Sequence, residues 1–179
     1  RLSGQHHKAD GYIEDTVSGV KLGGDDWYVA RASVLWRPTD ALSSTTIVDY
    51  YRNIGTPYPG VVRAIDPNGR YVRVAGAAAA NAFLAQQLAL GPYKLPGYST
   101  PDARRDDRQL KVINRTEFDL NESLKLKNIA GYTEVTNFQY YERGGTPRPL
   151  LIIGVPPAAR PDPTKQYSEE LQLQGHTDR

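Results

Sequence analysis

The chain of 179 residues is long enough for one domain with a substantial core, but it begins at Arg1 and contains no Met, so we expect it to be an excerpt from a longer polypeptide. Its 22 basic and 20 acidic side chains nearly balance, which argues against a surface that gathers nucleic acid, and the absence of Cys excludes disulfides and thiolate chemistry. No stretch approaches the roughly 18 consecutive apolar residues of a membrane-spanning helix, whereas a mean hydropathy of −0.56 is compatible with a barrel, in which only alternate strand residues face lipid.

The first predicted elements are two strands. A block over 10–19 is rich in strand-forming residues and is followed by turn-like glycines, so we expect a strand there with an uncertain end. A second strand is predicted over 27–38, and its apolar face consists of Tyr28, Ala30, Ala32, Val34 and Trp36. The opposite face carries Arg31, Ser33 and Arg37. From the first aromatic residue to the last, the strand rises roughly 20 to 25 Å when tilted, which matches the apolar band of an outer-membrane barrel.

A tight turn over 38–42 predicts that the chain returns as a hairpin through a third strand over 43–53. In that strand Val48 and Tyr50 lie on the apolar side and Asp49 on the other. Residues 53–107 then form a connection far longer than the roughly 4 to 6 residues typical of compact domains. Within it we expect a turn leading into a short strand over 65–72, and a helix over 77–91 that packs the loop.

Two long strands joined by a tight turn are predicted over 108–120 and 124–143. The first places Leu110, Val112 and Phe118 on one face and Arg115 and Glu117 on the other. A connection over 143–165 is rich in Gly and Pro, which favours an irregular loop because proline blocks a regular strand ladder. The last predicted strand, over 165–175, sets Tyr167, Leu171 and Leu173 against Glu170.

Short polar turns therefore alternate with long connections, and the strands exceed the roughly 5 to 6 residues common in globular domains. Bacterial outer-membrane barrels have short periplasmic turns and longer external loops. We predict an all-β fold: an antiparallel transmembrane β-barrel fragment of about six strands, with long extracellular loops and a short loop helix. The turns near 40 and 122 would be periplasmic, and the connections over 53–107 and 143–165 extracellular.

The predicted strands assign side chains to two environments. The residues predicted to face the membrane are Tyr28, Val34, Trp36, Val48, Tyr50, Leu110, Val112, Phe118, Leu126, Tyr132, Leu171 and Leu173. The residues predicted to face a water-lined lumen are Arg31, Asp49, Arg115, Glu117 and Glu170. We interpret Tyr28, Tyr50, Tyr132 and Tyr167 as interfacial anchors, because an amphipathic ring suits the headgroup layer.

Three stretches, WYVARASVLWRPTDALSSTTIVDYY, NRTEFDLNESLKLKNIAGY and KQYSEELQLQG, resemble the barrel strands of TonB-dependent outer-membrane receptors. The resemblance covers most of residues 10–175 and implies that 1–179 is part of a 22-stranded barrel domain in the bacterial outer membrane. It further implies an N-terminal plug domain and a TonB-contacting segment, both absent from this sequence. Partners would be outer-membrane lipid, the plug, TonB and a small-molecule ligand: a ferric siderophore, haem, cobalamin or a glycan, imported with energy coupled through TonB.

The sequence predicts no catalytic site, cofactor or metal site, because no acid-base or nucleophilic arrangement can be placed from its spacings. His6, His7 and His176 are its only histidines, and we interpret the first two as a solvated strand end or loop. Tyr58, Tyr93 and Tyr98 fall in the long external connection and are the candidate ligand contacts. Two alternatives stay open: a passive porin or barrel adhesin, and a soluble all-β carbohydrate-binding module whose apolar faces would meet a second sheet.

Overall fold

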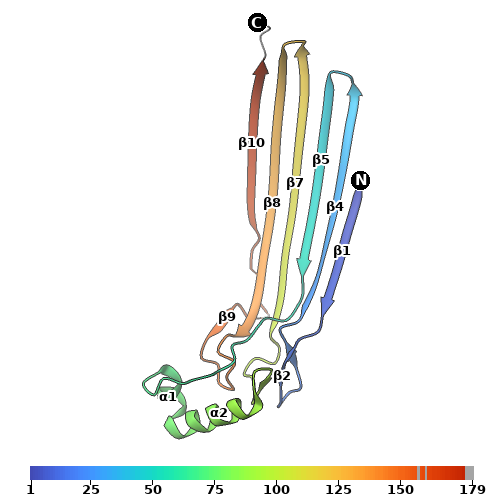
Figure 1. Ribbon diagram of the computed structural model, residues 1–179. Coiled ribbons are helices and arrows are strands. Elements are labelled where there is room, and N and C mark those ends of the chain that lie inside the picture. Colours follow the sequence, from blue (N-terminus) through green and yellow to red (C-terminus); the bar gives the residue numbers. More distant parts are fainter. Residues whose placement is uncertain (157, 160, 176–179) are drawn as a thin grey trace.

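One long antiparallel sheet, with a smaller folded layer at one end, makes up the chain (Figure 1). The structure is a computed structural model and describes residues 1–156, 158–159 and 161–175. Each neighbouring pair in the long sheet is antiparallel, and its strands in spatial order are β1 (Leu2–Ala9), β4 (Asp25–Thr39), β5 (Leu42–Asn53), β7 (Arg104–Asn121), β8 (Leu124–Glu142) and β10 (Thr164–Gly175). The predicted antiparallel all-β fold is confirmed at this level. The sheet is open, with β1 and β10 at its edges, so closure into a barrel stays a prediction.

Tight turns join β4 to β5 and β7 to β8 at the same end of the sheet (Figure 1). Thr39 Oγ1 accepts a hydrogen bond from the Leu42 amide at 3.1 Å, and Asn121 Oδ1 accepts one from the Ser123 amide at 2.9 Å. Side-chain oxygens of this kind hold a chain reversal by replacing a backbone acceptor. Both turns predicted from sequence are confirmed, and the long connections all lie at the opposite end.

Those connections fold into a compact layer, here called the loop layer, which comprises the described residues of 10–24, 54–103 and 143–163. It contains a three-stranded sheet in the order β3 (Lys21–Leu22), β2 (Ile13–Asp15) and β6 (Lys94–Leu95), and two helices, α1 (Arg70–Ala75) and α2 (Ala77–Leu90). The short strand β9 (Ile152–Gly154) pairs with the end of β8. A cluster of buried apolar residues lies here and consists of Ile13, Leu22, Leu95, Tyr98 and Ala103. The predicted helix over 77–91 is confirmed.

One predicted strand is shorter than expected, and another is wrong. Only Ile13–Asp15 is extended within 10–19, because the Asp15 carboxylate accepts hydrogen bonds from the Val17 and Ser18 amides, both at 3.2 Å, and turns the chain. The first long strand is instead Leu2–Ala9, which the sequence did not predict. The segment over 65–72 enters helix α1 rather than a strand, after a turn in which the Asp66 carboxylate accepts from the Asn68 amide at 2.8 Å.

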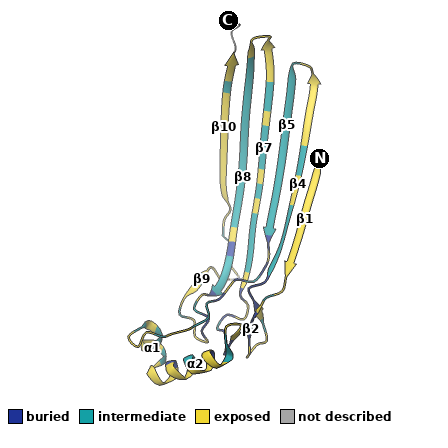
Figure 2. Cartoon of the chain, in the orientation of Figure 1, coloured by how far each residue is buried: buried dark blue, intermediate teal, exposed yellow. Residues whose placement is uncertain are grey.

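The faces of the long sheet are not covered by the rest of the described chain. Within its six strands the buried described residues are Asn53, Phe138 and Glu142, which lie at or near the ends of β5 and β8 that enter the loop layer. Figure 2 shows the long strands almost entirely in the colours of intermediate and exposed residues. A single sheet without a packed face has no core of its own. Among the described residues, no helix has the length and apolar character needed to cross a membrane.

Candidate functional site

The strand register sorts the long sheet into two chemically different faces. Residues directly opposite each other in an antiparallel pair share a face. One such row joins Ala32, Val48, Val112, Tyr132 and Tyr167 across five strands. Every second residue along each strand, counted from this row, points to the same side of the sheet. All residues predicted to face the membrane lie on that side, which we call the apolar face. Among them Val34, Trp36 and Leu171 are more than half exposed.

The opposite side, here called the charged face, carries every residue predicted to face a lumen. Arg31 Nε lies 3.4 Å from Asp49 Oδ1, and Arg115 Nε lies 3.5 Å from Glu117 Oε1. Glu117 also lies 3.7 Å from Lys125 Nζ and 3.6 Å from that of Lys127. The pairs of Arg31 with Asp49 and of Glu117 with the two lysines cross neighbouring strands, whereas Arg115 and Glu117 lie two residues apart on β7, as expected for polar side chains on one wet surface.

Glu170 is also on the charged face, where its Oε1 accepts a hydrogen bond from Gln172 Nε2 at 2.5 Å.

Three exposed tyrosines, Tyr12, Tyr58 and Tyr93, gather where the loop layer meets the charged face, and we call them the tyrosine cluster. The ring centroid of Tyr12 lies 6.1 Å from that of Tyr58 and 6.1 Å from that of Tyr93. Their exposed fractions are 55%, 41% and 62%. Aromatic rings in contact normally bury their area. The Tyr58 ring is tilted by 41° and the Tyr93 ring by 75° from the Tyr12 ring, so the three exposed rings form an angled aromatic surface that a ligand can contact.

Charged groups of the long strands border the tyrosine cluster. The Tyr58 hydroxyl donates to Asp25 Oδ2 at 2.6 Å, and this hydrogen bond raises the pKa of Tyr58 above its usual value. The Arg105 guanidinium lies 5.8 Å from the centre of the Tyr58 ring, and its nitrogens lie 3.8 Å from Asp25 and 3.5 Å from Asp107. The strand register puts Asp25, Arg105 and Asp107 on the charged face. The tyrosine cluster therefore combines aromatic faces with a negatively charged carboxylate and a positively charged guanidinium.

Backbone geometry fixes the position of Tyr58. The chain leaving β5 runs beside the chain entering β4: the Thr56 amide donates to the Gly24 carbonyl at 2.9 Å, and the Gly24 amide donates to Thr56 Oγ1 at 2.8 Å. Gly23 has a φ of +76°, and a Cβ there would lie 2.9 Å from Tyr58 Cδ1 and 3.2 Å from Tyr12 Cε1. Only glycine fits this position without displacing the rings.

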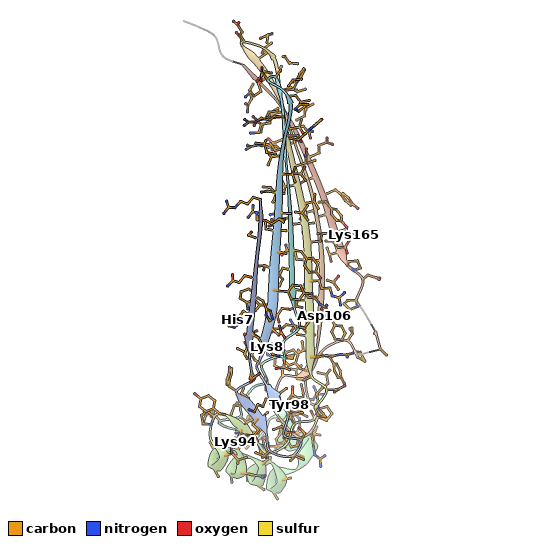
Figure 3. The ribbon with its side chains drawn as sticks, turned by 90° about the vertical axis from the view of Figure 1, so that its right-hand side faces the viewer. His7, Lys8, Lys94, Tyr98, Asp106 and Lys165 are labelled. Carbon is orange, nitrogen blue, oxygen red and sulfur yellow. The ribbon has the colours of Figure 1, made fainter. Side chains whose placement is uncertain are left out.

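The structure separates Tyr98 from the other two predicted ligand contacts. Tyr98 is 6% exposed, its hydroxyl donates to the Glu142 carbonyl at 2.7 Å and accepts from the Glu142 amide at 3.0 Å. Burial raises its pKa well above the usual value for tyrosine. Figure 3 shows its place inside the loop layer. It ties that layer to the end of β8, and we leave it out of the candidate ligand surface.

Sequence reasoning identified Tyr58 and Tyr93 but missed Tyr12, Asp25 and Arg105. The parallel pairing of β2 with β6 joins segments about 80 residues apart, through Glu14 opposite Lys94, and it is this long-range pairing that brings Tyr12 to Tyr93. No local spacing predicts such a contact.

The histidines form no metal cluster in the part of the chain that the structure describes. His6 Nε2 lies 2.8 Å from Asp26 Oδ1, and the His7 ring stacks on Trp27 with a centroid distance of 5.3 Å. No group of three or more His, Cys, Asp or Glu side chains among the described residues is arranged to hold a metal ion. His176 lies outside the described residues.

Comparison of the chain with family models, with curated proteins and with solved structures gave no match.

Proposed function

We propose that this chain forms part of the wall and the outer loops of a bacterial outer-membrane receptor, which imports a scarce nutrient with energy coupled through TonB. The observation that carries the proposal is the long sheet itself. It has one apolar and one charged face, neither of them packed against the described chain, with tight turns at one end and a folded loop layer at the other. Lipid would cover the apolar face, and water, the plug and ligand the charged one.

The tyrosines on the apolar face support strands that are tilted in a membrane. They do not lie in a single row of paired residues. Tyr132 and Tyr167 share a row that reaches β4 at Ala32, and Tyr28 lies four residues from Ala32, on the side away from the tight turn. Tyr50 lies between, with its ring centroid 5.9 Å from that of Tyr28. The line of tyrosines from β10 to β4 therefore shifts by four residues of about 3.3 Å each over four strand spacings of about 4.8 Å each, so it is inclined by roughly 35° to the rows of paired residues. Strands of outer-membrane barrels tilt by about 35 to 45°, so this oblique line of tyrosines is the expected form of an interfacial belt.

A polar group within the apolar face is satisfied internally. Asn114 Nδ2 donates to Ser44 Oγ at 3.0 Å and to Thr46 Oγ1 at 2.9 Å, while Thr116 Oγ1 donates to Asn114 Oδ1 at 3.0 Å. Polar groups facing hydrocarbon are strongly unfavourable unless they are hydrogen-bonded. This mutual bonding is compatible with a lipid-facing position in the middle of β5 and β7.

The tyrosine cluster would lie at the outer mouth of the lumen. It borders the charged face through Asp25 and Arg105, and it belongs to the layer opposite the tight turns. A ligand captured there by aromatic stacking and hydrogen bonding would stand at the start of a polar path along the charged face. This arrangement does not distinguish between a ferric siderophore, haem, cobalamin and a glycan, because ring faces and polar groups occur among all these ligand classes.

A soluble carbohydrate-binding module is the alternative from another class. It would need a second sheet packed on the apolar face. The three-stranded sheet of the loop layer lies at the end of the long sheet and not over its face (Figure 1). The uncovered apolar face and the oblique tyrosine line favour the membrane protein.

Membrane fractionation of the full-length protein tests the location. We expect the protein in the outer-membrane fraction, extracted by detergent and not by high salt. A protein that stays soluble without detergent would contradict the proposal and favour the carbohydrate-binding module.

Uptake measurements test transport and separate it from a passive porin. A strain lacking the gene is supplied with candidate siderophores, haem, cobalamin or glycans and complemented with the wild type or with Tyr12→Ala or Tyr93→Ala. We expect uptake of one ligand class to return with the wild type, to fall with either variant and to stop without TonB. Tyr71→Phe, in helix α1, is the matched loop-layer control. Flux that continues unchanged without TonB would indicate a porin.

A further inference from the structure

A group of arginines lies on the apolar face where the long strands enter the loop layer. Arg52 of β5 and Arg104 and Arg108 of β7 line a cavity of about 390 Å³ together with Asp106 of β7 and Phe138 of β8. The register puts Arg52 directly opposite Arg108 and Asp106 opposite Phe138, all on the same side as the oblique line of tyrosines. We call these three arginines the arginine cluster. Figure 3 shows Asp106 at the junction of the strands with the loop layer.

Asp106 holds two of these arginines side by side. Arg52 donates from Nε to Oδ1 at 2.7 Å and from Nη2 to Oδ2 at 3.0 Å. Arg108 donates from Nε to Oδ1 at 2.9 Å and from Nη2 to Oδ2 of the same carboxylate. Each guanidinium has five N–H donors in a planar fork. Two donors of each fork are directed at Asp106, and Arg52 Nη1 also donates to the Tyr28 hydroxyl at 3.5 Å, so that further donors of both forks remain to bind a second oxyanion.

The cluster keeps a positive charge after this internal pairing. Arg52 and Arg108 share the single carboxylate of Asp106, which leaves one positive charge in excess in this group of three side chains. The Arg104 guanidinium lies 5.3 Å from the centre of the Phe138 ring. The neighbouring acidic side chains on this face have contacts of their own: Glu134 lies 3.9 Å from Lys165 Nζ and accepts a hydrogen bond from the Tyr132 hydroxyl, and Asp26 Oδ1 lies 2.8 Å from His6 Nε2. The local field therefore favours an anion.

Its position relative to the tyrosines suggests which anion. On β5, Arg52 is the next residue of the apolar face beyond Tyr50, and on β10 Lys165 is the next beyond Tyr167, in both cases toward the loop layer. Interfacial tyrosines lie at the level of lipid headgroups. Side chains one step further from the hydrocarbon meet the phosphates of those headgroups.

We propose that the arginine cluster binds the phosphate group of an anionic lipid in the leaflet next to the loop layer. Arg52 and Arg108, held in parallel by Asp106, donate to the phosphate oxygens, while the acyl chains lie on the apolar face beside the tyrosines. Arginine forks match phosphate geometry, and a site between rigid strands holds them in place. This inference rests on the proposed membrane location and adds a specific lipid site to it.

Lipid retention by the full-length protein in bilayer nanodiscs tests the site. Discs of phosphatidylcholine containing a minority of phosphatidylglycerol are compared for the wild type and for Arg52→Gln/Arg108→Gln, and the retained phosphatidylglycerol is counted by native mass spectrometry. We expect the double variant to bind phosphatidylglycerol roughly 30-fold more weakly. Inorganic phosphate should not displace the lipid from the wild type, because it has no acyl chains to lie on the apolar face; displacement at millimolar phosphate would overturn a lipid site.

Two further variants keep the test decisive. Arg31→Gln/Lys111→Gln removes the same charge from the charged face and should retain the lipid. The triple variant Arg52→Gln/Asp106→Asn/Arg108→Gln leaves no carboxylate unpaired and should lose the lipid as the double variant does. Unchanged retention in the double and triple variants would overturn the lipid site and leave the receptor proposal standing. A wild-type protein that does not enter the bilayer would overturn the receptor proposal, and the lipid site with it.

Discussion

The substitution Tyr98→Phe tests how the loop layer is attached to the long sheet. Strand β7 begins at Arg104, opposite Tyr140, so Glu142 lies beyond the strand pairing on that side of β8. The Tyr98 hydroxyl pairs the backbone of Glu142 in place of a neighbouring strand: it donates to the Glu142 carbonyl at 2.7 Å and accepts from the Glu142 amide at 3.0 Å. Phenylalanine fills the same space and removes both bonds, which leaves a buried N–H without this partner.

The expected loss in the free energy of unfolding of the loop layer is about 2 to 3 kcal/mol, from two hydrogen bonds of about 1 kcal/mol each and the added penalty of an unsatisfied buried group. Because about 1.4 kcal/mol corresponds to tenfold in an equilibrium, hydrogen exchange in the layer should accelerate roughly 30- to 150-fold. The reporters are the Glu14 and Thr16 amides, which donate to the Tyr93 and Leu95 carbonyls. Amides in the middle of β5 and β7 should not change.

Tyr58→Phe is the matched control, because it removes one hydroxyl from an exposed ring and should alter exchange less than tenfold. Equal rates for the Glu14 and Thr16 amides in the wild type and in Tyr98→Phe would refute the role assigned to the buried hydroxyl. The pH dependence gives a second check. Burial raises the folded-state pKa of Tyr98, so its contribution to stability is complete below about pH 10, where tyrosine in the unfolded chain is neutral, and is lost as the pH rises beyond that value. Tyr98→Phe should weaken this decline.

Three other predictions concern the tyrosine cluster and the apolar face. Gly23→Ala should lower the free energy of unfolding by about 1 to 2 kcal/mol and reduce ligand uptake. Gly19→Ala is the control, because Gly19 also has a positive φ but has open space around a Cβ; it should lower the free energy of unfolding similarly and leave uptake unchanged. Thermal unfolding and uptake assays measure the two effects. Asp25→Asn should lower the pKa of Tyr58 toward its usual value, so that this tyrosine ionises at a lower pH in an ultraviolet absorbance titration; an unchanged titration would contradict the Asp25 contact. Asn114→Ala should destabilise the protein in bilayers by about 1 to 2 kcal/mol, measured by urea unfolding in vesicles, because Ser44 and Thr46 lose its amide; no loss would argue that this face meets water.

The long strands were predictable because one alternating pattern sets both their conformation and their faces. In β4 every second residue from Tyr28 to Trp36 is apolar, and the observed register keeps these residues in phase with β5, β7 and β8. A slip of one residue would move the entire apolar set to the other side, so the pattern also fixes the pairing.

Strand β1 was not predictable from the same signal. Its apolar-face residues are Leu2, Gly4, His6 and Lys8, which share no hydrophobic period. Its extended conformation follows from backbone pairing with β4, and the chain's own residues give no local sign of it. The strand predicted over 65–72 was wrong for a similar reason. A turn such as the one at Asn68 can precede a strand or a helix, and the residues of a six-residue helix do little by themselves to favour helix over strand.

The tyrosine cluster shows why loop function is harder to predict than strand faces. Tyr93 and Tyr98 are five residues apart in the same connection, yet one is 62% exposed and the other 6%. Their difference comes from β6, which lies between them and pairs with β2, so that the chain before it meets Tyr12 and the chain after it enters the core. Composition can suggest that a loop tyrosine binds ligand, but only tertiary pairing decides which one is accessible.

The two parts of the chain are stabilised by different surroundings, and this division has a functional consequence. The loop layer has a small buried core of its own, tied to β8 by Tyr98, whereas the long sheet buries almost nothing against the described chain. In the proposed receptor the sheet would take its stability from lipid on the apolar face and from paired edges, neither of which a ligand alters. The tyrosine cluster belongs to the loop layer, but its hydrogen bond is to Asp25 at the start of β4. Ligand capture would therefore involve a small, locally stabilised layer and leave the packing of the long strands unchanged.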